Sequence, residues 1–224
     1  MLDVGCGTGR LLLDYLADAV DIDGVDNSPE MLALCREKAV ELGLDVEGRL
    51  SLQEMDALDL QRRYLTILVP SSSFQLVIDP TAAAVTLARF KDHMEPGGLL
   101  VMSMMSKLWW SRRVPPQMEW SEWHMMVQRE RPGRRDSIRR WIRSRYDHEE
   151  QVQHEENRYE IVQDDVVVAQ ELHQRSPAVR WYTQDQTIQL MESAGFEDVR
   201  LTSGFTMDPA QAEDTTFCVL GYRR

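Results

Sequence analysis

Short apolar runs alternate with segments of helical periodicity along the first hundred or so residues of the chain. The apolar runs predict strands over residues 1–4, 21–25, 50–54, 64–69 and 99–104. The periodic segments predict helices over residues 9–19, 29–42 and 80–93. Strands that alternate with helices in this way are typical of βαβ units and a mostly parallel sheet.

The ends of these helices carry recognisable signals. Ser28 can cap the second helix, Pro29 suits its first turn, and Gly43 follows its last residue. The third helix begins at Asp79-Pro80, and Glu95-Pro96-Gly97-Gly98 is expected to end it. The strand that follows is largely apolar, as expected for a strand covered on both faces.

The pattern changes after residue 105. Residues 106–146 contain five of the six tryptophans, two adjacent prolines and an arginine-rich stretch. Strands are then expected, among them Tyr159–Gln163 and Val166–Leu172, joined at Asp164-Asp165. This part therefore predicts an antiparallel, β-rich insertion rather than a further βαβ unit.

Helical periodicity returns at Thr183, where Gln186 completes a capping box, and this helix is expected to end at Gly195. Two strands, over residues 197–203 and 215–222, finish the chain. We therefore expect a core over residues 1–105, an inserted cap over residues 106–182, and a return to the core over residues 183–224.

Acidic residues outnumber basic ones by 37 to 25, which gives a net charge of −12. Such a charge repels phosphate backbones at long range and disfavours a general nucleic-acid binder. The three cysteines, Cys6, Cys35 and Cys218, are widely spaced, which argues against disulfides and a zinc site and fits a reducing compartment. The sequence has no charged leader followed by an apolar run, and no stretch of about 18 apolar residues, so a cytoplasmic protein without a membrane span is expected.

The strongest chemical signal is the string Asp3-Val4-Gly5-Cys6-Gly7-Thr8-Gly9-Arg10 between a strand and a helix. Glycines let the backbone turn sharply and let a ligand approach amides that a Cβ would shield, and the helix start offers free N–H groups. Tight strand-to-helix turns also use glycine for structural reasons alone. Asp26 strengthens the signal because it ends the second strand, 17 residues after Gly9, where such folds place a carboxylate for the ribose hydroxyls.

Two cofactors fit a glycine loop of this kind. A dinucleotide site normally has its third glycine where this chain has Arg10, and a pyrophosphate favours a neutral or basic loop. Asp3 lies just ahead of the first glycine, and a carboxylate there suits a ligand with an ammonium or sulfonium charge. The residues therefore favour S-adenosylmethionine over NAD.

These motifs resemble those of class I, Rossmann-like S-adenosylmethionine-dependent methyltransferases of the small-molecule type. LDVGCGTGR is similar to motif I of that family, GVDNSPEMLALCREKA to motif II, and EMDALDL to motif III. HMEPGGLLVMSM resembles the helix and strand after motif IV, while RWYTQDQTIQLMESAGFEDVRL and TTFCVLGYRR resemble the last helix and the last two strands. The resemblance covers about residues 1–105 and 180–224. It implies an α/β fold with a doubly wound, seven-stranded, mostly parallel sheet and an inserted antiparallel β-rich cap.

The resemblance also implies roles for the residues that match these motifs. Asp3 and the loop backbone would hold the methionine part, and Asp26 would bind the ribose. Asn27 and Ser28 would lie beside the adenine, and Asp56 with the next amide would recognise its edge. Alternatively, Asp26 only leads into the helix, or Asp56 only serves a turn. The residues expected to bind the cofactor are Asp3, Gly5, Cys6, Gly7, Thr8, Gly9, Asp26, Asn27, Ser28, Asp56 and Ala57.

The chain departs from the family's pattern in two places. Pro70-Ser71-Ser72-Ser73-Phe74 follows the fourth strand, instead of the N/D-P-P-Y/F signature of enzymes that methylate amino groups of bases or glutamine. That departure puts nucleobase amino methylation in doubt. Members also usually carry a helical segment ahead of motif I, whereas this sequence starts with the first strand. A truncated product, a misplaced start or an incomplete lid would each account for it.

The insertion lies between the fifth strand and the last helix, so it can extend over the carboxyl ends of the strands, where ligands bind. In small-molecule methyltransferases such insertions form the substrate cap. Its aromatic side chains can line an apolar pocket, enclose a cation, or simply form the core of the insertion. The residues concerned are Trp109, Trp110, Trp120, Trp123 and Tyr146.

Eight arginines and two acids occupy residues 129–145. On a strand, Arg139, Arg143 and Arg145 would share one face because side chains alternate. One interpretation is an anion-binding surface for a carboxylate substrate or RNA phosphate. The other, which we favour, is a sheet face paired with the acid-rich stretch 148–160.

None of the five histidines has a metal-ligand spacing, so no metal site is expected. His124 lies in the tryptophan-rich part, which makes it, together with Tyr146, a weak candidate for a general base. A sulfonium methyl is already activated, so orientation of the acceptor can account for much of the acceleration. We therefore expect methyl transfer to oxygen or nitrogen of a small-molecule acceptor.

Three alternatives stay open at this point. The arginine run permits an RNA or protein methyltransferase, for which salt-sensitive RNA binding would be evidence. The missing segment ahead of motif I permits a non-catalytic module that binds the cofactor without turnover. A nucleotide-dependent oxidoreductase would require NAD binding, and Arg10 argues against it. The sequence makes no prediction about the identity of the acceptor or the oligomeric state.

Overall fold

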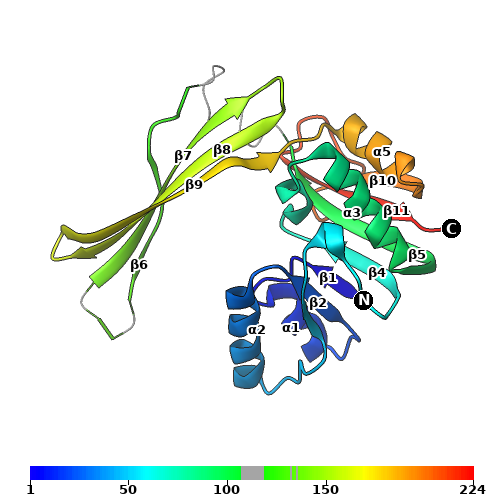
Figure 1. The fold of residues 1–224 in the computed structure, drawn as a ribbon, viewed down its shortest axis with the longest axis horizontal. Helices are drawn as coiled ribbons and strands as arrows, with labels where there is room; N and C mark the ends of the chain where they lie inside the picture. The colour runs from blue at the N-terminus through cyan, green and yellow to red at the C-terminus, as the bar shows by residue number, and fades with distance from the viewer. Residues whose placement is uncertain (107–118, 132, 135) are drawn as a thin grey trace. The chain divides into compact units, whose positions relative to one another are not determined.

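The computed structural model describes residues 1–106, 119–131, 133–134 and 136–224. The chain divides into two compact units. Residues 1–106 and 182–224 form the first, and residues 107–181 form the second. Figure 1 shows the first unit as a sheet with helices and the second as an antiparallel sheet of its own.

A seven-stranded sheet with the order β10-β11-β5-β4-β1-β2-β3 forms the first unit. Its strands are β1 Leu2–Val4, β2 Asp23–Asp26, β3 Leu50–Leu52, β4 Tyr64–Val69, β5 Met94–Met105, β10 Glu197–Ser203 and β11 Thr216–Tyr222. Strands β1 to β5 are parallel, and β11 runs antiparallel between β5 and β10. The strand order reverses beside β1, which is the topological switch point of a doubly wound sheet. The predicted seven-stranded, mostly parallel sheet is confirmed.

The helices of this unit begin at the caps that the sequence predicts. They are α1 Arg10–Ala17, α2 Pro29–Leu42, α3 Pro80–Asp92 and α5 Gln184–Ser193, with short 3-10 turns η1 Met55–Ala57 and η2 Ser73–Leu76. Ser28 accepts a hydrogen bond from the third residue of its helix at 3.1 Å, and Asp79 does the same at 2.8 Å. Thr183 and Gln186 form the predicted capping box. None of the described helices is long and apolar enough to cross a membrane.

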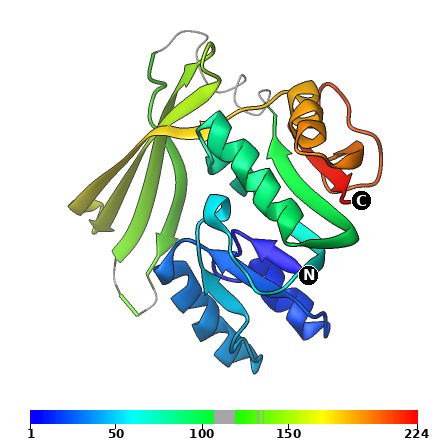
Figure 2. The same ribbon diagram turned by 45° about the vertical axis from the view of Figure 1, so that its right-hand side comes forward.

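Two buried clusters hold the helices on this sheet. One, which includes Leu12, Leu32 and Cys35, packs α1 and α2. The other, which includes Phe90 and Met191, packs α3 and α5. Because helices of both clusters cover the sheet, its central strands are apolar along most of their length. Figure 2 shows α3, in green, lying lengthwise against the sheet.

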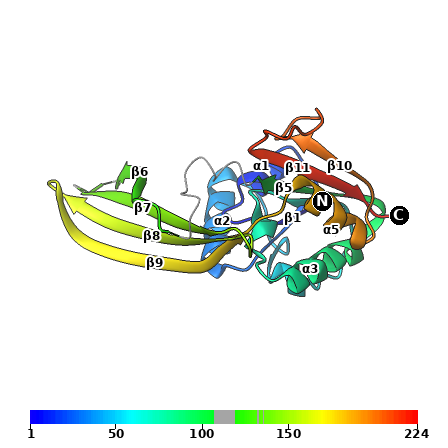
Figure 3. The same ribbon diagram turned by 90° about the horizontal axis from the view of Figure 1, so that it is seen from above.

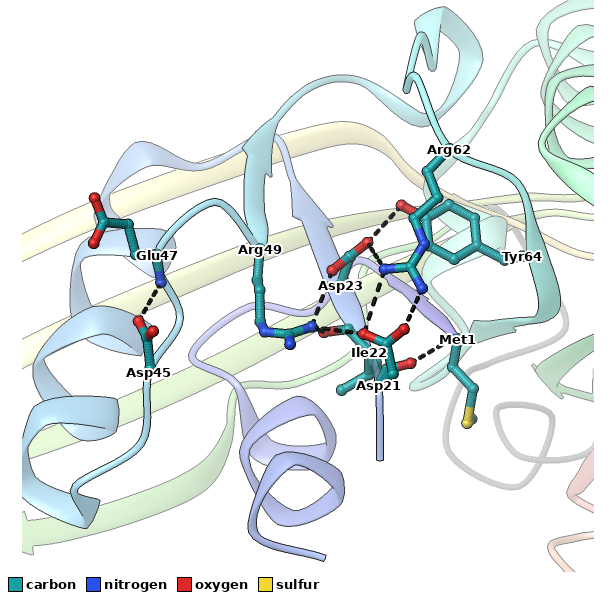
Figure 4. A network of polar contacts seen from close by, with 9 residues as sticks. All are labelled: Met1, Asp21, Ile22, Asp23, Asp45, Glu47, Arg49, Arg62 and Tyr64. Carbon is teal, nitrogen blue, oxygen red and sulfur yellow. Dashed lines mark hydrogen bonds and ion pairs between the residues drawn. The ribbon is translucent and has the colours of Figure 1, made fainter. Parts of the chain in front are cut away.

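A network of ion pairs ties together the amino ends of β2, β3 and β4 (Figure 4). Arg49 donates to Asp21 at 2.9 Å and to Asp23 at 3.4 Å, and Arg62 pairs with the same two carboxylates. The hydroxyl of Tyr64 donates to Asp23 at 2.8 Å, and burial with this hydrogen bond raises the pKa of Tyr64. The network therefore fixes three strands at the end of the sheet opposite their carboxyl ends.

The second unit is a four-stranded antiparallel sheet with the order β6-β7-β8-β9. Its strands are β6 His124–Glu130, β7 Asp136–Asp147, β8 Val152–Gln163 and β9 Val166–Arg180. Figure 3 shows this sheet from above, with its long strands curving together. The predicted antiparallel, β-rich insertion is confirmed, although β8 and β9 extend further than the sequence pattern indicates.

Arginine and tryptophan side chains alternate along one face of this second sheet. The guanidinium of Arg143 lies 5.0 Å from the ring centroid of Trp120 and 4.8 Å from that of Trp123. The guanidinium of Arg158 lies 4.7 Å from Trp123 and 5.2 Å from Trp141. Guanidinium groups bind favourably to indole faces. The tryptophans therefore enclose cations, but these cations are arginines of the protein itself.

Glutamates on β8 neutralise the same arginines. Glu156, which is 7% exposed, accepts a hydrogen bond from Nε of Arg143 at 2.7 Å. Glu160 accepts one from the indole of Trp141 at 2.7 Å and pairs with Arg158 at 3.0 Å. The interpretation of the arginine run as a sheet face paired with the acid-rich stretch is confirmed. Trp109 and Trp110 lie outside the described residues.

Strand β5 begins earlier than the sequence predicts. Glu95-Pro96-Gly97-Gly98 reads as a helix stop, yet α3 ends at Asp92 and the strand begins at Met94. The N–H of Gly97 donates to the carbonyl of Arg223 at 2.7 Å, and Gly98 accepts a hydrogen bond from Arg223 at 2.9 Å. Backbone pairing with the end of the chain therefore outweighs the local turn signal.

Replacement of Arg143 by Lys should destabilise the second unit by about 1–2 kcal/mol, because an ammonium keeps the charge but cannot stack on two indoles. Tryptophan fluorescence during urea unfolding measures this change. Arg139→Lys is the matched control, since Arg139 lies on the same face and its hydrogen bond goes to Gln128 at 3.2 Å. Equal losses in the two variants would contradict a stabilising role for the stacking.

Candidate functional site

The carboxyl ends of β1, β2 and β4 meet at the loop formed by residues 5–9. The backbone φ is 75° at Gly5 and 82° at Gly9, a region that side chains with a Cβ rarely adopt. A Cβ on Gly5 would lie 2.8 Å from Oγ of Ser73, and one on Gly9 would lie 2.6 Å from Sγ of Cys35. Both conformation and close packing therefore require glycine at these two positions.

The loop is held in place by its own backbone N–H groups. Those of Gly5 and Cys6 donate to the carbonyl of Val25 at 2.8 Å and 3.0 Å. That of Gly7 donates to Oδ2 of Asp26 at 2.8 Å. Three consecutive donors are thus used to tie the loop to the end of β2.

Asp26 is the last residue of β2 and is half-buried. Its Oδ2 accepts the N–H of Gly7, and its Oδ1 accepts the N–H of Ser28 at 2.9 Å. Two backbone donors therefore fix the orientation of the carboxylate. Each oxygen keeps a further lone pair, which suits a ligand that offers two neighbouring hydroxyl groups.

Asp3 lies on β1 and is 1% exposed. Its Oδ1 is buried without a hydrogen-bond partner among the described residues. Burial is the main cause that raises the pKa of Asp3 to about 7; the positive charge of Arg10 opposes it, and Asp26 adds to it. A buried carboxylate with an unpartnered oxygen fits a ligand that brings a positive charge.

The same arrangement works against a pyrophosphate. A pyrophosphate normally binds to free N–H groups at the start of the helix that follows the glycine loop. Here the N–H groups of Gly5, Cys6 and Gly7 are used within the protein, and the buried carboxylate of Asp3 lies on the strand that leads into the loop. A second anion there would meet like charge, so the site fits S-adenosylmethionine better than NAD.

Two of the residues expected near the adenine, Asn27 and Ala57, each donate a hydrogen bond to Glu54. Asn27 donates to the Glu54 carboxylate at 3.0 Å, and the N–H of Ala57 donates to the Glu54 carbonyl at 3.2 Å. Asp56 lies in the same 3-10 turn, η1, and is half-buried. Ser28 is engaged as the cap of α2. The structure thus brings Asn27 and η1 together beside the carboxyl ends of β2 and β3.

The side chains of Cys6 and Thr8 have partners of their own. Cys6 is 6% exposed within the cluster under α1 and α2, and burial raises the pKa of its thiol. Nζ of Lys38 donates to Oγ1 of Thr8 at 2.8 Å. The side chains of these two residues are therefore engaged within the protein.

The loop after β4 belongs to this region, although the sequence reasoning did not include it. Ser71 and Ser72 have φ values of 56° and 59°, which are uncommon for residues with a Cβ. Ser73 packs against Gly5 of the glycine loop. The three consecutive serines after Pro70 are the signal in the sequence that marks this loop.

Gln75 holds this loop to β5. Its side-chain amide donates to the carbonyl of Met105 at 3.2 Å, and its Oε1 accepts the N–H of Met105 at 2.7 Å. Gln75 is 1% exposed, so this pair of hydrogen bonds is shielded from water. Arg10 donates to Oγ of Ser71 at 3.2 Å, which links the loop to the start of α1.

Both candidate general bases lie in the second unit. His124 is exposed at the start of β6. Tyr146 is 4% exposed on β7, with its ring 4.8 Å from that of Trp181, and burial raises its pKa. A raised pKa keeps the phenol protonated at neutral pH, which works against Tyr146 as a base.

Comparison with known proteins agrees with this geometry. Residues 1–98 match the family model described as a methyltransferase domain. The dTDP-3-amino-3,4,6-trideoxy-alpha-D-glucopyranose N,N-dimethyltransferase of Streptomyces venezuelae is 28% identical over 110 residues, which is 49% of this chain and 42% of that protein. The ubiquinone biosynthesis O-methyltransferase of Bradyrhizobium sp. (strain ORS 278) is 29% identical over 110 residues, which is 49% of this chain and 41% of that protein. The matched region thus spans about two fifths of each curated relative.

A solved structure extends the likeness in fold to the whole chain. It is that of SAM-bound CalS10, an amino pentose methyltransferase from Micromonospora echinaspora involved in calicheamicin biosynthesis. Its TM-score is 0.67 at 21% identity, and the match covers 100% of this chain and 82% of that one. Likeness at this identity shows a shared fold.

Replacement of Asp3 by Asn should remove a pH dependence of stability. Because the pKa of Asp3 is raised to about 7 in the folded chain, ionisation of Asp3 destabilises the ligand-free fold progressively as the pH rises from about 4 to 7, by at most about 4 kcal/mol. We therefore expect Asp3→Asn to raise the free energy of unfolding at pH 8 and to raise it only about half as much at pH 5.5. Urea unfolding of both proteins at the two pH values measures this.

Asp45→Asn, in the exposed loop before β3, controls for the loss of one negative charge. A gain in Asp3→Asn that is the same at both pH values would count against an unpartnered buried carboxylate.

Proposed function

We propose that this chain is an enzyme that transfers a methyl group from S-adenosylmethionine to nitrogen or oxygen of a small-molecule acceptor. Its residues 1–98 match the model of a methyltransferase domain, and it shares its fold with a solved methyltransferase. The observation that carries this proposal is the pair of carboxylates beside the glycine loop. Asp3 has a buried oxygen without a partner among the described residues, and Asp26 is held by two backbone N–H groups.

Different residues of the chain would bind different parts of the cofactor. The Asp3 carboxylate, together with carbonyl groups of the glycine loop, would bind the ammonium of the methionine part. The Asp26 carboxylate would accept both ribose hydroxyls. Asn27 and Asp56, with the amide of Ala57, would lie at the adenine, where that amide would exchange its 3.2 Å bond to Glu54 for one to the base.

Bound cofactor supplies a methyl group on a positively charged sulfur, which needs no further activation. The task left to the protein is to hold the acceptor in line with that bond and to exclude water. The loop from Pro70 to Ser73 packs on Gly5, and two hydrogen bonds from the Gln75 side chain to the backbone of Met105 hold it to β5. Its backbone and serine hydroxyls are the groups of the first unit that we propose to position the acceptor.

Several observations favour a small acceptor over RNA or protein. The net charge is −12, and the arginines of β7 that would suit RNA are stacked on tryptophans and paired with glutamates. The relatives named above act on an amino sugar nucleotide or in ubiquinone biosynthesis, so an amine or hydroxyl on a small molecule is the first acceptor to test. We also propose a cytoplasmic location, which agrees with three free, buried cysteines.

Calorimetric titration with S-adenosylmethionine and S-adenosylhomocysteine should give binding to both, and Asp26→Ala should weaken it roughly 10- to 100-fold, the effect of losing hydrogen bonds to a charged group. Incubation with S-adenosylmethionine and a panel of amino sugar nucleotides, phenols, RNA and peptides should then yield S-adenosylhomocysteine with a small acceptor. Mass spectrometry of the acceptor locates the methyl group.

Asp45→Ala, at an exposed carboxylate away from the site, should bind like the parent, and thermal unfolding checks that Asp26→Ala still folds. Binding without turnover on any acceptor would favour the non-catalytic module. Binding of NAD in place of S-adenosylmethionine would favour the oxidoreductase, and neither outcome is compatible with the proposal.

A further inference from the structure

Arg10 is the first residue of α1 and follows the glycine loop directly. It is exposed, and its Nη2 donates to Oγ of Ser71 at 3.2 Å, so its guanidinium lies between the start of α1 and the loop after β4. A guanidinium carries several N–H donors, and those on Nε and Nη1 have no partner among the residues that the structure describes. Arg10 therefore keeps free donors at the carboxyl ends of β1 and β4.

Arg10 and Asp3 influence each other without forming a contact. The positive charge of Arg10 opposes the burial that raises the pKa of Asp3. Even so, Oδ1 of Asp3 has no hydrogen-bond partner among the described residues. A cation with free donors and a buried carboxylate with a free oxygen thus lie at the same end of β1, and a ligand that carries both charges can satisfy both groups.

We propose that Arg10 binds the carboxylate of the methionine part of S-adenosylmethionine, while Asp3 binds the ammonium on the same carbon. The assignment rests on the proposed function, because it concerns the cofactor of that reaction. An α-amino acid carries its ammonium and its carboxylate side by side, so both lose water together when they bind, and each then requires an opposite charge. A guanidinium suits the carboxylate because it can donate two parallel hydrogen bonds to it.

A carboxylate that enters this site needs a positive partner of its own. Asp3 and Asp26 already place two carboxyl groups at the ends of β1 and β2. The backbone N–H groups of residues 5–7 and 9 are hydrogen-bonded within the protein. Repulsion between like charges would therefore weaken the binding of a zwitterion, and a nearby cation with free donors removes that obstacle.

Lys38 is a second cation near the glycine loop. It lies on α2, and its Nζ donates to Oγ1 of Thr8 at 2.8 Å. An ammonium is a point charge without the planar fork that matches a carboxylate. The positive charge that acts on Asp3 is moreover that of Arg10. Arg10 is therefore the better candidate, and Lys38 is the alternative to test.

Calorimetric titration at pH 8 with S-adenosylmethionine and with its decarboxylated form tests the assignment. The decarboxylated form keeps the sulfonium and the ammonium but lacks the carboxylate. The parent should bind S-adenosylmethionine roughly 10- to 100-fold more tightly, the effect of one charge-assisted pair. Arg10→Gln should lose this preference, because it weakens the binding of S-adenosylmethionine and leaves that of the decarboxylated form unchanged.

Two further variants are matched to Arg10→Gln. Arg10→Lys keeps the charge without the fork and should keep part of the preference. Arg36→Gln removes an exposed cation from α2 and should keep all of it.

The ratio of the two affinities separates contact with the carboxylate from damage to the site, because a merely structural Arg10 would weaken both ligands alike. Such equal weakening in Arg10→Gln would overturn the assignment. A preference that Arg10→Gln keeps and Lys38→Gln loses would overturn it in favour of Lys38. Equal affinity of the parent for the two compounds would overturn the assignment and leave the proposed function intact, whereas binding of neither compound would overturn both.

Discussion

The N–H groups of the glycine loop turn inward, to the carbonyl of Val25 and the carboxylate of Asp26, and the character of the site follows from this. Donors that hold the loop cannot also bind a phosphate. Beside this loop lies the buried Oδ1 of Asp3, which has no partner among the described residues. A buried acceptor without a hydrogen-bond donor is energetically unfavourable. The site therefore favours a ligand that brings a positively charged donor.

In the second unit, charged side chains serve mainly to stabilise a sheet. Its sheet carries many arginines, and on one face they are neutralised internally: Arg143 and Arg158 lie between tryptophans and pair with buried glutamates. On the other face, Glu171 and Arg175 at the β9 edge are exposed. The same residue types therefore stabilise the sheet where they stack on aromatic rings and are buried, whereas at the exposed edge an ion pair contributes little.

Local signals in the sequence predict much of the fold. The caps at Ser28, Asp79 and Thr183 and the glycine loop depend on neighbouring residues, and the structure has all of them where they are predicted. The early start of β5 is not local, because it depends on pairing with Arg223 at the other end of the chain. The left-handed backbone of Ser71 also escapes prediction, since packing of the loop imposes it against the intrinsic preference of serine.

The candidate site likewise combines features that the sequence predicts with features that only the fold reveals. Residue types and spacing were enough to point to Asp3 and Asp26, but no sequence pattern states that one carboxylate is anchored by two N–H groups and the other lacks a partner for one oxygen. That distinction depends on burial, which requires the complete sheet. Likewise, the assignment of the arginines to structure rather than to anion binding required the register of β7 against β8.

The central claim is that the Asp3 carboxylate binds the positive charge of the cofactor. The number of protons released on cofactor binding tests this claim most directly. Calorimetric titration with S-adenosylmethionine at pH 6, in buffers of different ionisation enthalpy, counts the protons exchanged. The pKa of Asp3 is about 7 in the free chain, so its carboxyl is mostly protonated at that pH and must ionise to bind an ammonium. Release of close to one proton at pH 6, absent in Asp3→Asn and at pH 8.5, is the result expected. Binding that releases no proton at pH 6 would show that Asp3 does not meet the cation.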